Sequence, residues 1–224
     1  DAVDSDEIAA GAIDLAHMSV NSIDSDQYVD GSIDTAHIAD SQVTVAKTTG
    51  VQTGWVKIGS TTISTQTEPV NIEHGWDSTY DIYKIFVTNM NGSSDGVDVR
   101  LRLKIGGSYQ TGNIYHFQYS RFSGSGIASA GSVDTSFITL NSNQGTGMGE
   151  AVNYEITFHN PDETSFNKHI SWIGSQAEQT SGRGEGIIGG GGSTSGQGAL
   201  TGFQFYMDGG AIDAGTFASY GLIK

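Results

Sequence analysis

The chain has 224 residues, of which 36% are hydrophobic and 32 are Gly, with no Cys and a formal net charge of −15. This acidic balance argues against nucleic acid as a partner, and the absence of Cys excludes a disulfide framework and thiolate chemistry. No apolar run reaches the roughly 18 residues that span a membrane, so membrane insertion is not expected. High Gly usage favours short strands joined by many turns.

Residues 1–50 form a decapeptide repeat of five blocks: DAVDSDEIAA, GAIDLAHMSV, NSIDSDQYVD, GSIDTAHIAD and SQVTVAKTTG. The third position of every block is Val or Ile, and the fourth is Asp in the first four blocks. The eighth position of those four blocks is Ile, Met or Tyr. The predicted core of this segment consists of these apolar positions: Val3, Ile8, Ile13, Met18, Ile23, Tyr28, Ile33, Ile38 and Val43.

The five-residue spacing of the apolar positions fits neither a continuous strand nor a continuous helix. On a strand such residues lie on opposite faces, and on an α-helix they lie about 140° apart. Each block is therefore expected to combine a short extended piece with one helical turn that begins at the Asp, a good N-cap residue. Gly11 and Gly31, or Asn21, are expected to end the turn, where a positive φ is needed.

A single copy of this repeat has too few large apolar side chains to fold alone. About two of them per block cannot offset the entropy of ordering the chain. Three chains wound about a common axis would pool these residues in one core, so residues 1–50 are predicted to be a trimeric stalk. The alternative is a disordered acidic linker, which the strict apolar period disfavours.

Residues 51–224 are predicted to be an all-β head. Apolar and polar residues alternate over 97–105 and 152–159, the pattern of half-buried antiparallel strands. Further strands are expected at 55–64, 80–90, 113–120, 168–174, 201–207 and 215–223, separated by turn signals such as Asn91-Gly92 and Asp95-Gly96. About eight short strands in this length predict an antiparallel β-sandwich of the jelly-roll kind, with no helix.

The head carries no catalytic, metal-binding or cofactor-binding signature, so none of these sites is expected. It lacks the spacing of a zinc protease motif, of a serine nucleophile elbow and of a phosphate-binding loop. The one unusual segment is residues 182–198, with nine Gly in seventeen positions. It is interpreted either as a flexible connection or as a loop whose bare backbone contacts a partner, with Ile187 and Ile188 as anchors.

Aromatic residues beside turns are the other candidates for a binding role. Trp76 follows His74-Gly75, and Tyr109 follows Gly106-Gly107, so both rings could stack on a sugar. Together with Ile187 and Ile188 they form the predicted receptor-binding set.

Several segments of the chain resemble structural proteins of marine bacteriophages. The repeat, above all GSIDTAHIADSQVT, is similar to the repeats of tail fibres, and TYDIYKIFVTNM, VDVRLRLKIGG and ALTGFQFYMDGGAIDAGTFASYGLIK are similar to C-terminal domains of phage fibre and appendage proteins. The resemblance implies a homotrimeric, extracellular virion appendage: a tail fibre joined to virion proteins upstream, whose head binds a host-surface glycan or protein.

Three alternatives to the tail fibre stay open on the sequence alone. One is a fibre or knob that decorates the capsid without an essential receptor role. Another is a carbohydrate-active enzyme, a depolymerase, and the third is a bacterial surface adhesin.

Overall fold

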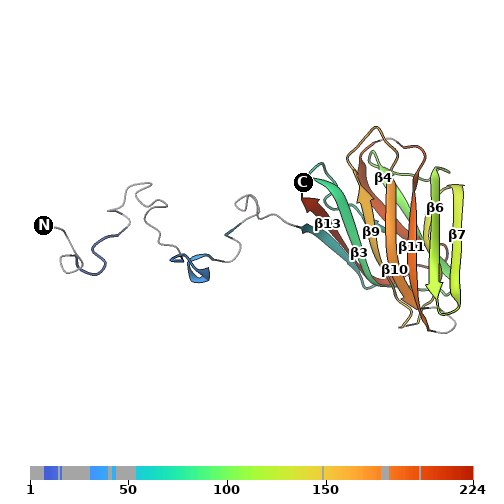
Figure 1. The fold of residues 1–224 in the computed structure, drawn as a ribbon, viewed down its shortest axis with the longest axis horizontal. Coiled ribbons are helices and arrows are strands. Elements are labelled where there is room, and N and C mark those ends of the chain that lie inside the picture. The colour runs from blue at the N-terminus through green and yellow to red at the C-terminus, as the bar shows by residue number, and fades with distance from the viewer. Residues whose placement is uncertain are drawn as a thin grey trace. The chain divides into compact units, whose positions relative to one another are not determined.

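The computed structural model describes residues 8–14, 16, 31–39, 42–43, 54–147, 149–177, 182–196 and 198–223. The chain divides into two compact units, residues 1–52 and residues 53–224 (Figure 1). This boundary lies within two or three residues of the predicted one. Among the described residues, no helix is long and apolar enough to cross a membrane.

The described parts of the repeat form capped turns at the predicted positions. A 3₁₀ turn, η3 (Thr35–His37), follows Asp34, whose side chain accepts the backbone N–H of Ala36 at 2.9 Å. Asp14, two repeats earlier, accepts the N–H of Ala16 at the same distance. The expected N-cap role of the Asp is therefore confirmed. Gly11 and Gly31 have φ of 79° and 81°, as predicted for the glycines that separate the turns.

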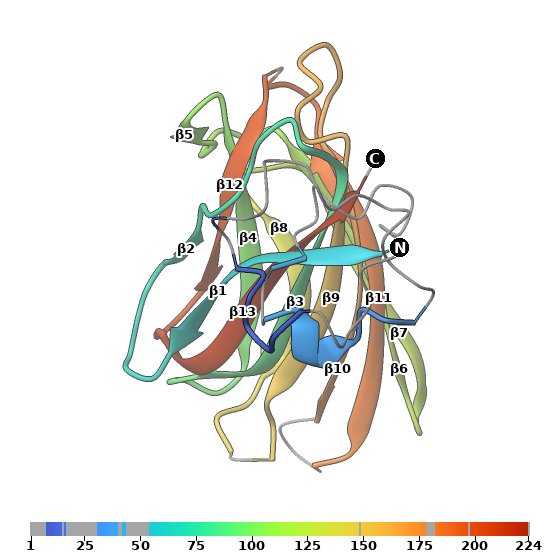
Figure 2. The same ribbon diagram turned by 90° about the vertical axis from the view of Figure 1, so that its left-hand side faces the viewer.

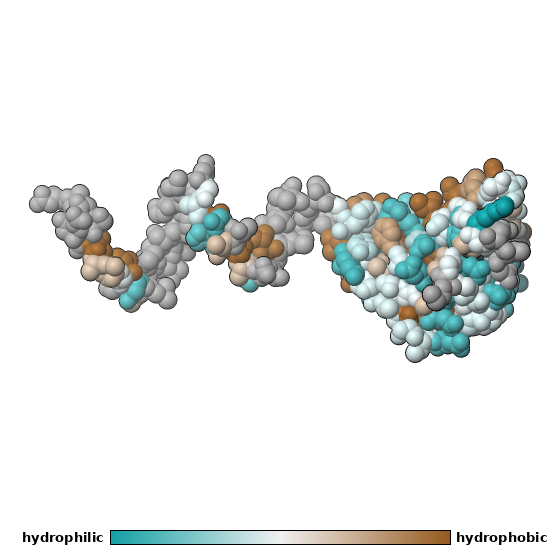
Figure 3. Space-filling model, turned by 90° about the horizontal axis from the view of Figure 1, so that it is seen from below, coloured by the Kyte–Doolittle hydropathy of each residue, from teal (hydrophilic) through white to brown (hydrophobic). Residues whose placement is uncertain are grey.

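The predicted stalk core is exposed in the single chain. Ile8, Ile13, Ile33, Ile38 and Val43 are between 40% and 58% exposed, and the described repeat segments carry brown, apolar surface in Figure 3. Val3, Met18, Ile23 and Tyr28 lie outside the described residues. Among the described residues of the chain, none buries these apolar positions.

The head is a sandwich of two antiparallel sheets, which confirms the predicted all-β class (Figure 2). The first sheet has eight strands in the order β1 (Trp55–Ile63), β13 (Ile212–Ile223), β3 (Tyr80–Gly92), β9 (Val152–His159), β10 (His169–Ala177), β11 (Gly184–Ser193), β6 (Tyr115–Ser123) and β7 (Gly126–Thr135). The second consists of β2 (Val70–Ile72), β12 (Leu200–Met207), β4 (Val97–Ile105) and β5 (Ser108–Tyr109), with β8 (Ile138–Gln144) also paired to β4.

Eight of these strands pair in the order of a jelly roll. They are β1-β13-β3-β9 in the first sheet and β2-β12-β4-β8 in the second. The other strands are insertions: β5 to β7 lie between β4 and β8 in sequence, and β10 and β11 lie between β9 and β12. Four of the inserted strands widen the first sheet. We call β1, β13, β3 and β9 its jelly-roll half, and β10, β11, β6 and β7 its added half.

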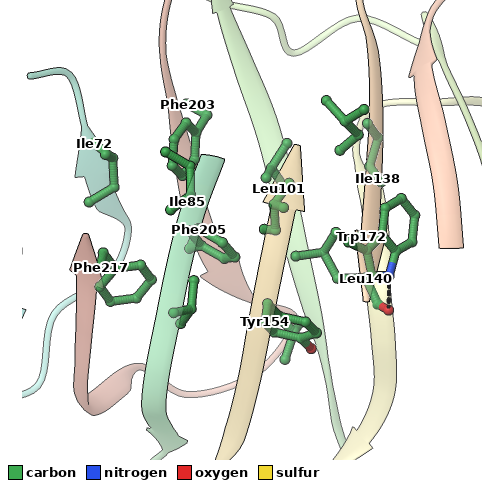
Figure 4. Close-up of a cluster of buried hydrophobic side chains, with 14 of the residues drawn as sticks. Ile72, Ile85, Leu101, Ile138, Leu140, Tyr154, Trp172, Phe203, Phe205 and Phe217 are labelled. Atoms are coloured by element: carbon green, nitrogen blue, oxygen red, sulfur yellow. Dashed lines mark hydrogen bonds between the residues drawn. The ribbon is translucent and has the colours of Figure 1, made fainter. Parts of the chain in front are cut away.

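Aromatic side chains from the two sheets meet in the core (Figure 4). Phe158 of β9 stacks on Phe203 of β12, with ring centroids 5.2 Å apart, and Phe205 of β12 lies 5.0 Å from Phe217 of β13. In the added half, the indole N–H of Trp172 donates to the carbonyl of Leu140 at 3.0 Å. Full burial of such side chains contributes about 1.5–3 kcal/mol each, so these contacts hold the two sheets together.

The Gly-rich segment corrects the sequence analysis. It was interpreted as a connection or a loop, but Gly184–Ser193 is strand β11, paired along its length with β10 on one side and β6 on the other. At Gly189, Gly191 and Gly192, close neighbours leave no room for a side chain. A Cβ on Gly191 would lie 2.8 Å from the carbonyl oxygen of His116, and one on Gly192 would lie 2.3 Å from that of Lys168.

Candidate functional site

The outward face of the added half is hollowed where β11 lacks side chains. Side chains of a strand alternate between its two faces, and on β11 Ile187 is 3% exposed whereas Ile188 is 50% exposed. Gly190 and Gly192 therefore share the outward face with Ile188. Gly192 lies between His169 of β10 and His116 of β6, two strands that are about 10 Å apart across β11.

A hollow of about 520 Å³ lies over these glycines, and we call it the glycine-floored hollow. Its polar lining residues are His116, Gln118, Ser132, Asn167, His169, Ser193 and Thr194. The side chains of Gln118, Asn167 and His169 make no hydrogen bond to another described residue, so their donors and acceptors are free for a ligand. Thr194 is occupied, because its hydroxyl donates to the carbonyl of Ile114 at 3.1 Å.

The hollow also has an apolar part and no charged side chain. Val133 contributes exposed apolar surface, whereas Phe117 and Ile170 border the hollow with their side chains on the inward face of the sheet, where Ile170 is 4% exposed and the ring of Phe117 stacks on Tyr119. None of the described residues that line it is Asp, Glu, Lys or Arg. The carboxylate of Asp134 lies outside the lining, with Oδ1 3.8 Å from Nε2 of His116. This arrangement can hold an uncharged ligand with hydroxyl groups, and His116 and His169 are the only titratable side chains in its described lining.

A second hollow, of about 320 Å³, continues along β10 and β11. Gly189 lines it, and the neighbouring Gly190 lines the first, so the two are adjacent along the same strand. Ile173 and Ile188, which are about half exposed, stand at its side together with Glu155, Thr157 and Ser171. The two hollows together follow the outward face of β11.

Strand β7 forms the outer wall of the glycine-floored hollow and is exposed on both faces. It pairs only with β6, and Ile127 and Val133 on it are 71% and 63% exposed. The β6–β7 ladder shifts register between Tyr115 and Phe117, and Asp134 in the same stretch has φ of 55°. This irregularity turns the end of β7 beside His116.

The inward face of the added half holds a buried polar network. Glu185 is 7% exposed, and its carboxylate accepts from Nη1 of Arg121 at 3.3 Å and from Nε2 of Gln176 at 2.7 Å. The side-chain amide of Asn141 on β8 donates to Gln176 in turn. The network fixes β11 to β10, β6 and the second sheet. Because Glu185 faces inward, its carboxylate is on the opposite side of the sheet from the hollow.

The predicted receptor-binding set does not come together. Trp76 is a core residue, since its ring stacks on Tyr83 at 4.7 Å and meets the edges of Phe158 and Phe203 at 5.1 and 5.7 Å. Ile187 is buried. These positions correct both predictions. The ring of Trp76, although it stands beside a turn, packs against the core, and Ile187 of the Gly-rich segment faces inward.

Tyr109 lies in the second sheet, in a polar cluster of its own. Its hydroxyl donates to Glu73 at 2.5 Å, and Nζ of Lys104 lies 5.4 Å from the ring centroid. Hydrogen bonds from Lys104 and Tyr109 hold the pKa of Glu73 below its ordinary value, while burial raises that of Tyr109. Of the predicted set, Ile188 alone lines a hollow of the added half.

Sequence reasoning missed His116, Gln118 and His169. A signal was present for two of them: in YHFQY, alternation places His116 and Gln118 on the face opposite Tyr115 and Tyr119, which are buried. His169 became recognisable only when the Gly-rich segment proved to be the strand between it and β6.

Glycoside cleavage uses two acids, and Asp98 and Asp208, on β4 and just after β12, are two carboxylates that lie close together. Asp98 and Asp208 both contact Nη2 of Arg100, at 3.3 and 2.8 Å. Burial, and then the charge of Asp208, raise the pKa of Asp98, while Arg100 lowers it. Neither acid lines the glycine-floored hollow, and a shared guanidinium is typical of a structural ion pair.

Comparison of the chain with protein-family models, with curated proteins and with solved structures found no match. In the described part of the chain, no three His, Asp or Glu side chains are grouped so that they could hold a metal ion.

Proposed function

We propose that this chain is a homotrimeric virion appendage of a bacteriophage, a tail fibre whose repeat forms the stalk and whose C-terminal head attaches to the host surface. Its partners are two further copies of itself, virion proteins upstream and a host-surface receptor. The proposal assigns it no catalytic activity and no cofactor.

The observation that carries the proposal is the regular exposure of apolar side chains in the repeat. Ile13 and Ile33, twenty residues apart, are 58% and 46% exposed. Each stands just before an Asp whose side chain caps a turn. Exposed branched residues at a fixed period are unfavourable in a monomer and favourable in a stalk of several chains. Three chains related by a common axis give every copy the same burial.

The outward face of the jelly-roll half supports contact between the three heads. Trp55 on β1 is 38% exposed, with Nζ of Lys84 5.0 Å from its ring centroid. Beside it, Phe86 and Tyr220 form an edge-on pair with centroids 5.4 Å apart on the same face. In the proposed trimer, these faces of the three heads contact one another.

The uncharged hollow of the added half supports binding rather than cleavage. A glycoside hydrolase needs two carboxylates at its substrate, whereas the described lining of this hollow has none. The hollow also lies in the half of the sheet that does not contain β1, so a trimer formed through the jelly-roll half leaves it open to a receptor.

Two measurements test the proposal. Light scattering on the purified chain should give three times the monomer mass of 23.5 kDa; a monomer or dimer contradicts it. Gold-labelled antibodies against the head should mark phage tails in electron micrographs. Labelling of capsids indicates the decoration fibre instead, and labelling of bacterial cells without phage indicates an adhesin. Release of reducing ends from host polysaccharide by the chain would show an enzyme.

A further inference from the structure

We propose that the glycine-floored hollow binds a neutral carbohydrate, as the receptor site of the head. This inference rests on the proposed attachment function and goes beyond it by naming the site and the ligand class. It locates recognition on β11 and its two neighbours rather than on loops.

The size and shape of the hollow fit a sugar. Its volume of about 520 Å³ lies within the roughly 300–1,000 Å³ of small-molecule sites. The floor is backbone at Gly190 and Gly192, so a flat ring can approach the sheet more closely here than over any side chain. The adjoining hollow beside Ile173 and Ile188 provides room for a second unit of a chain.

The absence of charge selects a neutral ligand. The chain as a whole carries a net charge of −15, and 16% of its residues are charged, yet no charged side chain is among the described residues of the lining. An anionic sugar would find no Lys or Arg to balance it there and would meet Asp134 next to His116. For a metal ion, the described residues hold no group of three His, Asp or Glu side chains that could bind it. The lining therefore disfavours both an anionic sugar and a metal cation as the ligand.

The side chains present match the two faces of a sugar. The free amides of Gln118 and Asn167 and the imidazole of His169 can each both donate and accept, as a ring of hydroxyl groups requires. Val133, which is 63% exposed, offers apolar surface for the C–H groups of the sugar. Amides and an imidazole around a backbone floor can make these hydrogen bonds without burying a charge.

The test fills the floor of the hollow without disturbing the sheet. Gly190 suits this purpose, because a Cβ there would meet only the carbonyl oxygen of Ile170, at 3.7 Å, and its φ is not in the left-handed region. We expect Gly190→Val to keep the parent melting temperature and trimer mass. Ser175→Val is the matched control: Ser175 is an exposed residue on the outward face of β10 that lines neither hollow. Gln118→Ala removes a polar contact and leaves the floor open.

Binding is measured with the intact chain on a printed array of neutral and acidic oligosaccharides. We expect the parent and Ser175→Val to bind neutral sugars and Gly190→Val to lose this binding. Gln118→Ala should bind about tenfold more weakly, the change expected for one or two lost hydrogen bonds. Neutral binding that survives in Gly190→Val, binding of acidic sugars alone, or no binding at all would each overturn the inference.

Attachment of the labelled chain to a panel of marine bacteria separates this inference from the proposed function. If the parent attaches and Gly190→Val attaches equally well, the hollow is not the receptor site, whereas the attachment function stands. If the parent attaches to no strain, the attachment function fails. Loss of attachment in Gly190→Val alone supports both.

Discussion

Gly189 of β11 lies directly opposite Trp172 of β10, and a Cβ on Gly189 would fall 2.2 Å from Cζ2 of the indole ring. The ring therefore occupies the space where the side chain of residue 189 would be. In this position Trp172 is 2% exposed and its N–H reaches the carbonyl of Leu140 in the second sheet. The missing side chain on one strand makes possible the contact between the sheets.

Gly189→Ala should destabilise the head. The added methyl group would collide with Trp172, which is enclosed by the core and can move only at the expense of its bond to Leu140. Overpacking of this kind costs typically about 1–3 kcal/mol. Chemical denaturation followed by Trp fluorescence measures the loss. Gly190→Ala is the control, since its methyl group would point to the open hollow, and equal stability of the two variants would contradict the assigned packing.

The contact between Gly189 and Trp172 also shows which parts of the fold could be predicted from the sequence and which could not. Alternation predicted the strands at 97–105 and 152–159 with the bounds that the structure has. It could do so because in each strand one face is buried and the other is partly exposed to solvent. Strand β11 has no such alternation, since its inward positions 189 and 191 are also Gly. Gly189 is required by Trp172 on one neighbouring strand and Gly191 by His116 and Phe117 on the other, and no local pattern contains these contacts.

The candidate site was less predictable than the fold for a related reason. Its residues come from strands far apart in sequence, such as His116 on β6 and His169 on β10, and they meet only because β11 pairs between them. For Trp76 the sequence was misleading. The turn beside it suggested an exposed ring, but the ring contacts Phe158 of one sheet and Phe203 of the other. Position relative to a turn does not determine side-chain direction.

The stalk can be tested at its apolar positions. Ile13→Asp combined with Ile33→Asp would place six carboxylates per trimer at the proposed shared core, and an unpaired charge in such a place costs several kcal/mol. We expect residues 1–45 to become sensitive to protease while the head keeps its melting temperature. Ala12→Asp combined with Ser32→Asp adds the same charge one position earlier in each block. Equal protease resistance of both double variants would show that Ile13 and Ile33 face solvent.

Glu68 gives a prediction of pH dependence. Although the residue as a whole is exposed, burial of its carboxyl group against β12 raises its pKa to about 7, and the backbone N–H of Met207, 3.2 Å away, lowers it in part. A pKa above the ordinary value of 4.5 means that the folded state holds the proton more tightly. The associated stability is present below pH 4.5 and is lost as the pH rises through about 7.

Glu68→Gln should remove this dependence. Relative to the parent, the variant should gain in melting temperature from pH 5 to pH 8. Glu73→Gln should change the pH profile of the melting temperature in the opposite direction. The pKa of Glu73 is lowered, so the stability that its ionised carboxylate contributes is present at neutral pH and is lost in acid. Parallel pH profiles for the parent and Glu68→Gln would contradict the assignment.

The buried network around Glu185 gives the last prediction. Glu185→Ala would leave the guanidinium of Arg121 and the amide of Gln176 without their acceptor, in a place where Glu185 is 7% exposed. Hydrogen bonds to a charged group contribute about 1.5–3 kcal/mol, and an unsatisfied partner adds its own cost, so a loss of about 3 kcal/mol is expected. Arg121→Ala should cost less, because its side chain is 22% exposed and Gln176 still donates to the carboxylate. Since the two residues share one interaction, the double variant should lose less stability than the sum of the single variants. Additive losses in denaturation would show that Arg121 and Glu185 stabilise β6 and β11 independently of each other.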